Sequence, residues 1–141
     1  MNKPKVSVTV VTLLLTTIGA AAHHAFEAEY DEKQLVTVTG VVTKFEWTNP
    51  HAWMYLNVRD ESGNVSNWSF EMGAPGGLLR RGWKKGELKR GDEVTIDGYS
   101  SRHHARVANA RMVMLPDGRK LFGGFQSTPG NPTGPGNPTG K

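Results

Sequence analysis

Hydrophobic and polar residues alternate along much of the chain between positions 35 and 122, the pattern of β-strands with one buried face. The clearest run is Ala52–Asp60, where Ala, Met, Leu and Val occupy one face and Trp53 and Tyr55 lie on the other. Leu35–Trp47 before it is dense in Val and Thr, β-branched residues that suit a pleated surface. Val65–Met72 after it places Trp, Phe and Met on one face. The three runs predict three consecutive strands.

The apolar phase of the first run slips by one residue at Gly40. Val36 and Val38 share a phase before the glycine, whereas Val41 and Phe45 share the opposite phase after it. A glycine at such a slip is typical of a β-bulge or a sharp coil in a long strand. We therefore predict an irregularity at Gly40.

A short helix and further strands follow. Gly73–Arg90 interrupts the alternation, and Leu78–Trp83 within it can form one or two helical turns. Leu78, Leu79 and Trp83 are expected to face inward. The later runs predict strands at Glu93–Tyr99, Val107–Leu115 and Lys120–Phe122.

Three strands, one short helix and further strands form the element order of an OB-type barrel. A glycine-bent first strand suits such a barrel, because closing a small barrel requires strongly coiled strands. We expect a mainly β fold: a small OB-like barrel of five to six strands, with one short helix between strands three and four. Another small β-barrel or a half-open sandwich is the alternative.

The N-terminus has the layout of a secretory signal. Lys3 and Lys5 precede the apolar run Val6–Ile18, and the small residues Ala20–Ala22 follow it. The apolar run is shorter than the roughly 20 residues that span a membrane. Residues 1–22 are therefore expected to be a signal peptide cut after Ala22, and the protein to be periplasmic or secreted. An uncleaved membrane anchor is the alternative.

The remaining 119 residues divide into three parts. Residues 23–34 are polar and acidic around Phe26 and Tyr30, which predicts an extended arm pinned by two aromatics. Residues 35–125 contain the strand pattern and form the β-barrel domain. Residues 126–141 hold two copies of Pro-Gly-Asn-Pro-Thr-Gly, a composition that cannot bury a core and predicts a disordered tail.

Charge and cysteine content narrow the function classes. The chain has a formal charge of +4, and loss of Lys3 and Lys5 with the signal peptide lowers it to +2, so nucleic acid is not an expected partner. The membrane is expected to be contacted only through the signal segment. The absence of cysteine excludes disulfides, thiolate metal sites and a cysteine nucleophile.

Five stretches resemble a family of small exported bacterial proteins classed as a domain of unknown function, with a match that spans roughly Ala20 to Gly124. The stretch Glu46–Trp53 contains the distinctive string WTNPHAW. The resemblance implies an exported location and no established activity. The other four stretches are His23–Phe26, Leu79–Trp83, Gly91–Val94 and Ala108–Arg111.

The histidines suggest a metal site. Cleavage after Ala22 would make His23 the N-terminus, so that its α-amine and its ring nitrogen can chelate one ion. A further imidazole, from His24 or from His51 in the turn after the first strand, would complete a nitrogen site suited to copper(II). His103 and His104 are further candidate ligands. The histidines lack the fixed spacing of a known metal motif, so the alternative is a flexible arm and a turn histidine bonded to the backbone.

A second hypothesis is a module that binds no metal and holds an envelope glycan, peptide or lipid headgroup. Trp53 and Tyr55 face away from the expected core and can stack on a ligand ring. The further candidate ligand-binding residues are Trp47 and Asn49 around the turn, and Arg80 and Arg81 in a basic cluster that extends to Arg90.

Enzymatic patterns are weak in this sequence. There is no nucleophile elbow and no glycine-rich loop before a helix, so no catalytic residue is predicted. Glu46 and Glu71 would form a carboxylate pair only if the fold brings them together. A copper-dependent oxidative enzyme is the third and weakest hypothesis, after a copper-binding module and a metal-free binding module.

Overall fold

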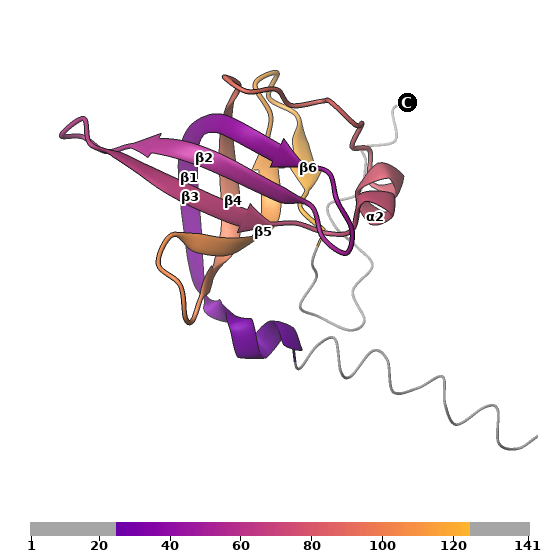
Figure 1. Ribbon diagram of the computed structural model, residues 1–141, viewed down its shortest axis with the longest axis horizontal. Helices are drawn as coiled ribbons and strands as arrows, with labels where there is room; N and C mark the ends of the chain where they lie inside the picture. The colour runs from indigo at the N-terminus through magenta and orange to yellow at the C-terminus, as the bar shows by residue number, and fades with distance from the viewer. Residues whose placement is uncertain (1–24, 125–141) are drawn as a thin grey trace, which may run out of the picture.

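The computed structural model describes residues 25–124, and six strands in one sheet form most of this part (Figure 1). The predicted signal peptide, His23, His24 and the predicted tail lie outside the described residues. A mainly β fold is confirmed. The elements are β1 (Tyr30–Glu46), β2 (Trp53–Arg59), β3 (Val65–Glu71), α2 (Pro75–Arg80), β4 (Glu93–Ser101), β5 (Val107–Met114) and β6 (Lys120–Phe122).

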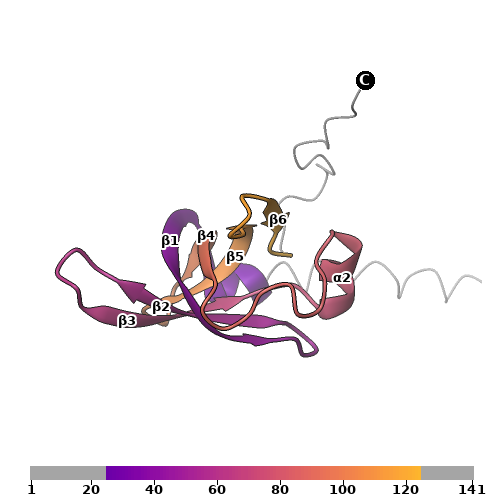
Figure 2. The ribbon, with the colours of Figure 1, turned by 90° about the horizontal axis from the view of Figure 1, so that it is seen from above.

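The strands follow the order β3-β2-β1-β4-β5-β6, and an additional pairing of β3 with β5 closes five of them into a ring. This closing pairing is parallel and places Glu71 opposite Asn109, whereas the other pairings are antiparallel. The long, curved β1 makes the ring possible, because its first part pairs with β4 and its last part with β2 (Figures 1 and 2). Closure leaves one face of each ring strand inside.

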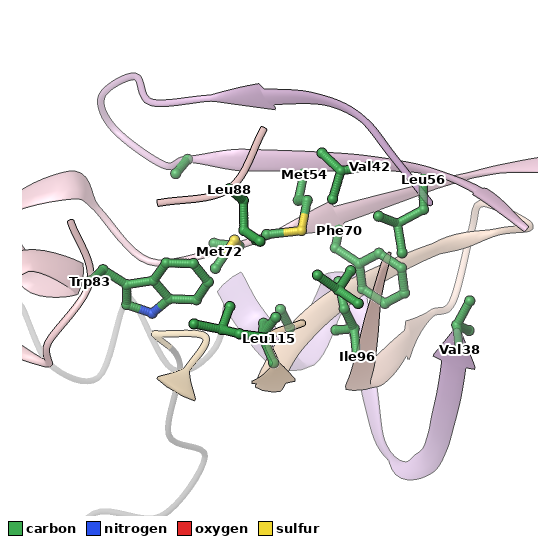
Figure 3. Packing of buried hydrophobic residues seen from close by; sticks show 14 of the residues in the cluster. Val38, Val42, Met54, Leu56, Phe70, Met72, Trp83, Leu88, Ile96 and Leu115 are labelled. Atoms are coloured by element: carbon green, nitrogen blue, oxygen red, sulfur yellow. The ribbon is translucent and has the colours of Figure 1, made fainter. Parts of the chain in front are cut away.

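The interior of the ring is filled by one apolar cluster (Figure 3). Met54, Leu56 and Phe70 are fully buried, as the alternation of β2 and β3 predicts. Trp83, which follows α2, packs at one end of the cluster, and its indole nitrogen donates a hydrogen bond to the Phe122 carbonyl at 2.9 Å. α2 lies at this end, beside β6 (Figures 1 and 2).

β1 has two irregularities, and neither lies at Gly40: one falls between Asp31 and Leu35 in the pairing with β4, and the other lies three residues after Gly40 in the pairing with β2. Gly40 pairs regularly with Val94, and Val41 is exposed. The register shifts between Val42 and Lys44, which leaves Thr43 as the extra residue of a bulge. A glycine is needed at position 40 for another reason. Gly40 faces inward, and β2 comes so close that a Cβ there would lie 2.8 Å from the Asn57 carbonyl oxygen.

Two local predictions are wrong. Residues 25–29 form a helical turn rather than an extended arm, and β1 begins directly after it at Tyr30. Phe26 and Tyr30 are nevertheless buried, as pinning of this segment by its aromatics requires. Leu79 is exposed, because the short α2 turns only Leu78 and Pro75 inward. No helix among residues 25–124 has the length and apolar character needed to cross a membrane.

Gly40→Ala should lower the free energy of unfolding by about 1–3 kcal/mol, because the new methyl group must displace the β2 backbone. Urea unfolding followed by circular dichroism measures this change. Gly77→Ala is the matched control: its Cβ meets no atom within 4 Å, and alanine favours the helix, so stability should stay equal or rise. Equal stability of Gly40→Ala and the wild type would contradict the close approach.

Candidate functional site

Glu71 connects three distant parts of the chain at one end of the ring. It is the last residue of β3 and pairs with Trp53 on β2 and with Asn109 on β5. Its side chain is 15% exposed, and both carboxylate oxygens accept hydrogen bonds. The Tyr30 hydroxyl donates to Oε2 at 2.5 Å, and the His51 ring contacts Oε1 through Nδ1. A largely buried carboxylate needs such partners, since removing it from water is costly.

Tyr30 is a permanent donor in this arrangement. Burial, followed by the hydrogen bond to Glu71 and the negative charge of Glu71, raises the pKa of the Tyr30 hydroxyl far above its usual range. The phenol therefore keeps its proton at neutral pH. Its ring packs on Phe26 at a centroid distance of 5.2 Å, and Phe26 meets Tyr99 edge-on at 5.9 Å.

His51 faces Glu71 from the turn between β1 and β2. The Asn49–Pro50 peptide in this turn is cis, and the Thr48 hydroxyl donates to the His51 carbonyl oxygen at 3.3 Å. The His51 side chain is 51% exposed. Because an ionised carboxylate only accepts hydrogen bonds, Nδ1 carries the proton in the neutral ring, and Nε2 keeps a free lone pair. Metal-binding histidines commonly have this orientation, with a carboxylate on the other ring nitrogen.

The loop after β4 holds the helical turn of residues 25–29 against the ring. The Arg102 guanidinium donates through Nε to the carbonyl oxygens of Glu27 and Tyr30, at 2.9 and 3.2 Å. The Arg102 backbone N–H donates to the Glu29 carbonyl oxygen at 2.8 Å. The His103 ring bonds the Ala28 carbonyl oxygen at 3.0 Å. Basic side chains thus cap the free carbonyl groups at the end of the turn.

Two pockets adjoin Glu71 and share the side chains of Glu29, Tyr30 and Glu71 as a common wall. The first, called the His51 pocket, has a volume of about 390 Å³, and Ala25, His51 and Asn109 also line it. The second, called the Trp53 groove, has a volume of about 420 Å³. Its further lining residues are Trp53, Tyr55, Ser69, His104 and Val107.

Asn109 is the buried polar residue of the His51 pocket. Its residue exposure is 4%, and within the described part of the chain its Oδ1 has no hydrogen-bond partner. Native proteins rarely leave a buried acceptor unpaired.

The described histidines do not converge on a complete metal site. His51 contacts Glu71, whereas the rings of His103 and His104 are 6.5 Å apart on the opposite loop. No group of three or more His, Asp or Glu residues between positions 25 and 124 could hold a metal ion. Because His23 and His24 lie outside the described residues, the five-histidine prediction stays a prediction.

The predicted ligand-binding residues divide into separate places. Trp53 and Tyr55 line the Trp53 groove together. Trp47 instead packs on Phe45 against the core, and Asn49 is exposed in the turn.

The basic cluster lies apart from both pockets. Neither Arg80 nor Arg81 lines the His51 pocket or the Trp53 groove, and the Arg81 guanidinium lies over the Phe122 ring at 4.3 Å. The suggested carboxylate pair does not form either. Trp53 stands between Glu46 and Glu71 in the register, and each carboxylate has its own hydrogen-bond partners.

Sequence reasoning missed Glu29, Tyr30 and Asn109. The buried aromatics of the arm were the available signal for Tyr30, since an isolated tyrosine in an acidic segment needs a hydrogen-bond partner when it is buried. Glu29 and Asn109 gave no local signal, because their roles depend on pairings between segments far apart in sequence.

Residues 11–109 match the model of one protein family, described as "Family of unknown function (DUF6152)". The match covers more than half of the chain, so the chain belongs to this family. No curated protein matches the sequence.

Tyr30→Phe should lower the free energy of unfolding by about 1–3 kcal/mol, because it leaves one oxygen of the largely buried Glu71 carboxylate without its donor. Tyr99→Phe is the matched control, since the Tyr99 hydroxyl makes no side-chain hydrogen bond within residues 25–124, and its effect should stay within about 0.5 kcal/mol. Urea unfolding of both variants measures the difference. Equal stabilities of the two variants would contradict the supporting role of Tyr30.

Proposed function

We propose that this member of the family is an exported OB-like barrel that binds copper(II) through nitrogen ligands beside Glu71. The observation that carries the proposal is the contact of Glu71 with His51 Nδ1. This contact leaves the Nε2 atom of the exposed His51 ring free to bind a metal ion, and the Glu71 carboxylate on the other ring nitrogen fixes the orientation of the ring. His51 is the anchor of the proposed site.

Two features support the OB-like barrel. The ring runs β1-β2-β3-β5-β4 and is closed by a parallel β3–β5 pairing, with the short α2 between β3 and β4. OB folds are five-stranded, partly open barrels that commonly bind ligands on the face of strands 2 and 3 and on the loops between strands 1 and 2 and between strands 4 and 5. His51 and His104 belong to the two corresponding loops of this chain.

The arm would supply the remaining ligands. The signal-like N-terminus supports export and cleavage after Ala22, which would give His23 a free α-amine next to its own imidazole. Ala25, two residues further on, lines the same pocket as His51. The amine, the His23 ring and the His51 ring together make a three-nitrogen donor set that suits copper(II). His24, His103 and His104 are the alternative imidazoles.

Copper is favoured over zinc for this donor set. Nitrogen sites bind copper(II) more tightly than zinc in the general order of divalent metals. An α-amine with a pKa near ~7.7 and imidazoles near ~6.5 lose their protons readily at neutral pH, as metal binding requires. The proposed role is binding or delivery, which requires affinity alone. An oxidative enzyme is the weaker alternative, because the sequence contains no pattern for a catalytic step.

The experiment uses protein matured in an exporting host, with its N-terminus determined by mass spectrometry. The matured chain should begin at His23 and bind one copper(II) ion per chain in a calorimetric titration. His23→Ala and His51→Ala should each weaken binding at least about tenfold. Asn67→Ala, which changes an exposed β3 residue outside the His51 pocket, is the control and should bind copper(II) like the wild type. A mature chain that begins elsewhere, or equal affinity of all forms, would refute the proposal.

Glu71→Gln tests the carboxylate separately. It keeps the shape of the side chain and removes the charge that orients His51, so copper affinity should fall about 10–100-fold. Glu46→Gln is the control, because Glu46 contacts Lys44 and Tyr55 instead of a histidine. Competition with a chromogenic copper chelator gives the affinities, and equal affinities of the two variants would contradict the role of Glu71.

A further inference from the structure

The Trp53 groove has a chemical character that differs from that of the His51 pocket. It lies on the outer face of β2 and β3, on the far side of the shared Glu71 wall, and its volume is typical of a small-ligand site. Its aromatic residues come from alternate positions of β2, so they face away from the core residues Met54 and Leu56. Among the described histidines, His51 does not line this groove, whereas the alternative copper ligand His104 does.

Trp53 and Tyr55 form a shared aromatic surface. Their rings are nearly parallel, with an interplanar angle of 22° and a centroid distance of 6.5 Å. This spacing is too wide for direct face-to-face contact, so the rings offer neighbouring surfaces. The Tyr55 hydroxyl donates to Glu46 at 2.9 Å, which holds its ring in place. Preformed aromatic surfaces bind flat rings at small entropic cost, since tyrosine and tryptophan have few rotatable bonds.

Hydrogen-bond donors and acceptors both surround the Trp53–Tyr55 surface. Glu29 and Glu71 contribute carboxylates, of which Glu29 accepts one hydrogen bond from Ser101 at 3.2 Å. The Ser69 hydroxyl and the His104 ring make no hydrogen bond to another side chain within residues 25–124, so they can donate or accept. The groove thus offers acceptors and donors next to stacking rings.

The charges exclude several ligand classes. Neither Glu29 nor Glu71 forms an ion pair with a lysine or arginine within residues 25–124, so these carboxylates disfavour an anionic ligand such as a nucleic acid at their end of the groove. The Lys44 ammonium, which lies 5.8 Å from the Tyr55 ring centroid, is paired with Glu46 and so adds little net positive charge there. An organic cation would suit the carboxylates and rings but would leave the Ser69 and His104 groups unmatched. Sugar hydroxyls both donate and accept, and a sugar ring stacks on aromatic side chains.

We propose that the Trp53 groove binds a short neutral saccharide, with sugar rings stacked on Trp53 and Tyr55 and hydroxyl groups bonded to Glu29, Ser69 and His104. This site shares the Glu71 wall with the pocket of His51, the anchor of the proposed copper site, and it does not depend on metal binding. The Tyr30–Glu71 wall lies between the two ligands.

The test uses the matured full chain in the presence of a chelator, so that metal binding cannot contribute. Tetrasaccharides of glucose, of mannose and of N-acetylglucosamine are titrated while tryptophan fluorescence and ¹H–¹⁵N spectra are recorded. At least one should bind with a dissociation constant of about 10 mM or lower and shift the Trp53 indole signal. Tetramethylammonium chloride and a thymidine tetranucleotide are the competing ligand classes and should bind more weakly.

Three variants examine the groove. Trp53→Ala should weaken saccharide binding about tenfold, and Trp53→Phe should restore part of it, because phenylalanine keeps a stacking face. Glu29→Gln should weaken it less, since the amide still accepts one hydrogen bond. Asn67→Ala is the control, an exposed β3 residue that does not line the groove. Circular dichroism establishes that each variant is folded.

Three outcomes would overturn the proposal: no saccharide bound up to about 10 mM, equal binding by the wild type and a folded Trp53→Ala variant, or tighter binding of the cation or nucleotide than of any saccharide. The copper proposal is unaffected by all three, because the measurements are made on the metal-free protein. Loss of copper binding in His51→Ala would likewise leave saccharide binding unchanged.

Discussion

One largely buried carboxylate, that of Glu71, must have hydrogen-bond donors for both of its oxygens, and this requirement determines how the surrounding segments are arranged. Glu71 lies at the end of β3, where this strand pairs with β2 on one side and with β5 on the other, and the β3–β5 pairing closes the ring. A charge in this position is stable only if both oxygens have donors. Tyr30 supplies one from the start of β1 and His51 the other from the first turn. The requirement therefore connects the beginning of the sheet, its first loop and its closing strand pair.

The arm follows from the same requirement. Tyr30 is the first residue of β1 and pairs with Ser101 on β4, so the chain just before it also lies against the ring. Arg102 and His103 hold it there by bonding carbonyl oxygens of the helical turn, and Phe26 adds a buried ring beneath it. The same contacts bring Ala25 to the pocket of His51. A structural need of the fold thus places the beginning of the described chain beside an exposed imidazole, which is the basis of the copper proposal.

The alternation of apolar and polar residues was sufficient to predict the strands, because β2 and β3 each bury one face and carry apolar side chains on that face. It misplaced the bulge of β1, because an inward glycine leaves no side chain to mark its phase. The helical turn of residues 25–29 was missed for a different reason. Its carbonyl groups are capped by Arg102 and His103, about 75 positions away in the sequence. The Trp53–Tyr55 surface was predictable, and the role of Glu71 was not, since it arises from pairings across three strands.

The central claim is that Glu71 holds the proton of His51 on Nδ1 and leaves Nε2 bare. Long-range ¹H–¹⁵N correlation spectra of the metal-free protein, recorded above the titration of its histidines, measure the tautomer of each ring directly. His51 should be protonated on Nδ1, and His103, whose Nε2 bonds a carbonyl oxygen, should be protonated on Nε2 and serve as the internal reference. A His51 ring protonated on Nε2 would contradict the account, because its free nitrogen would then face Glu71 and not the pocket.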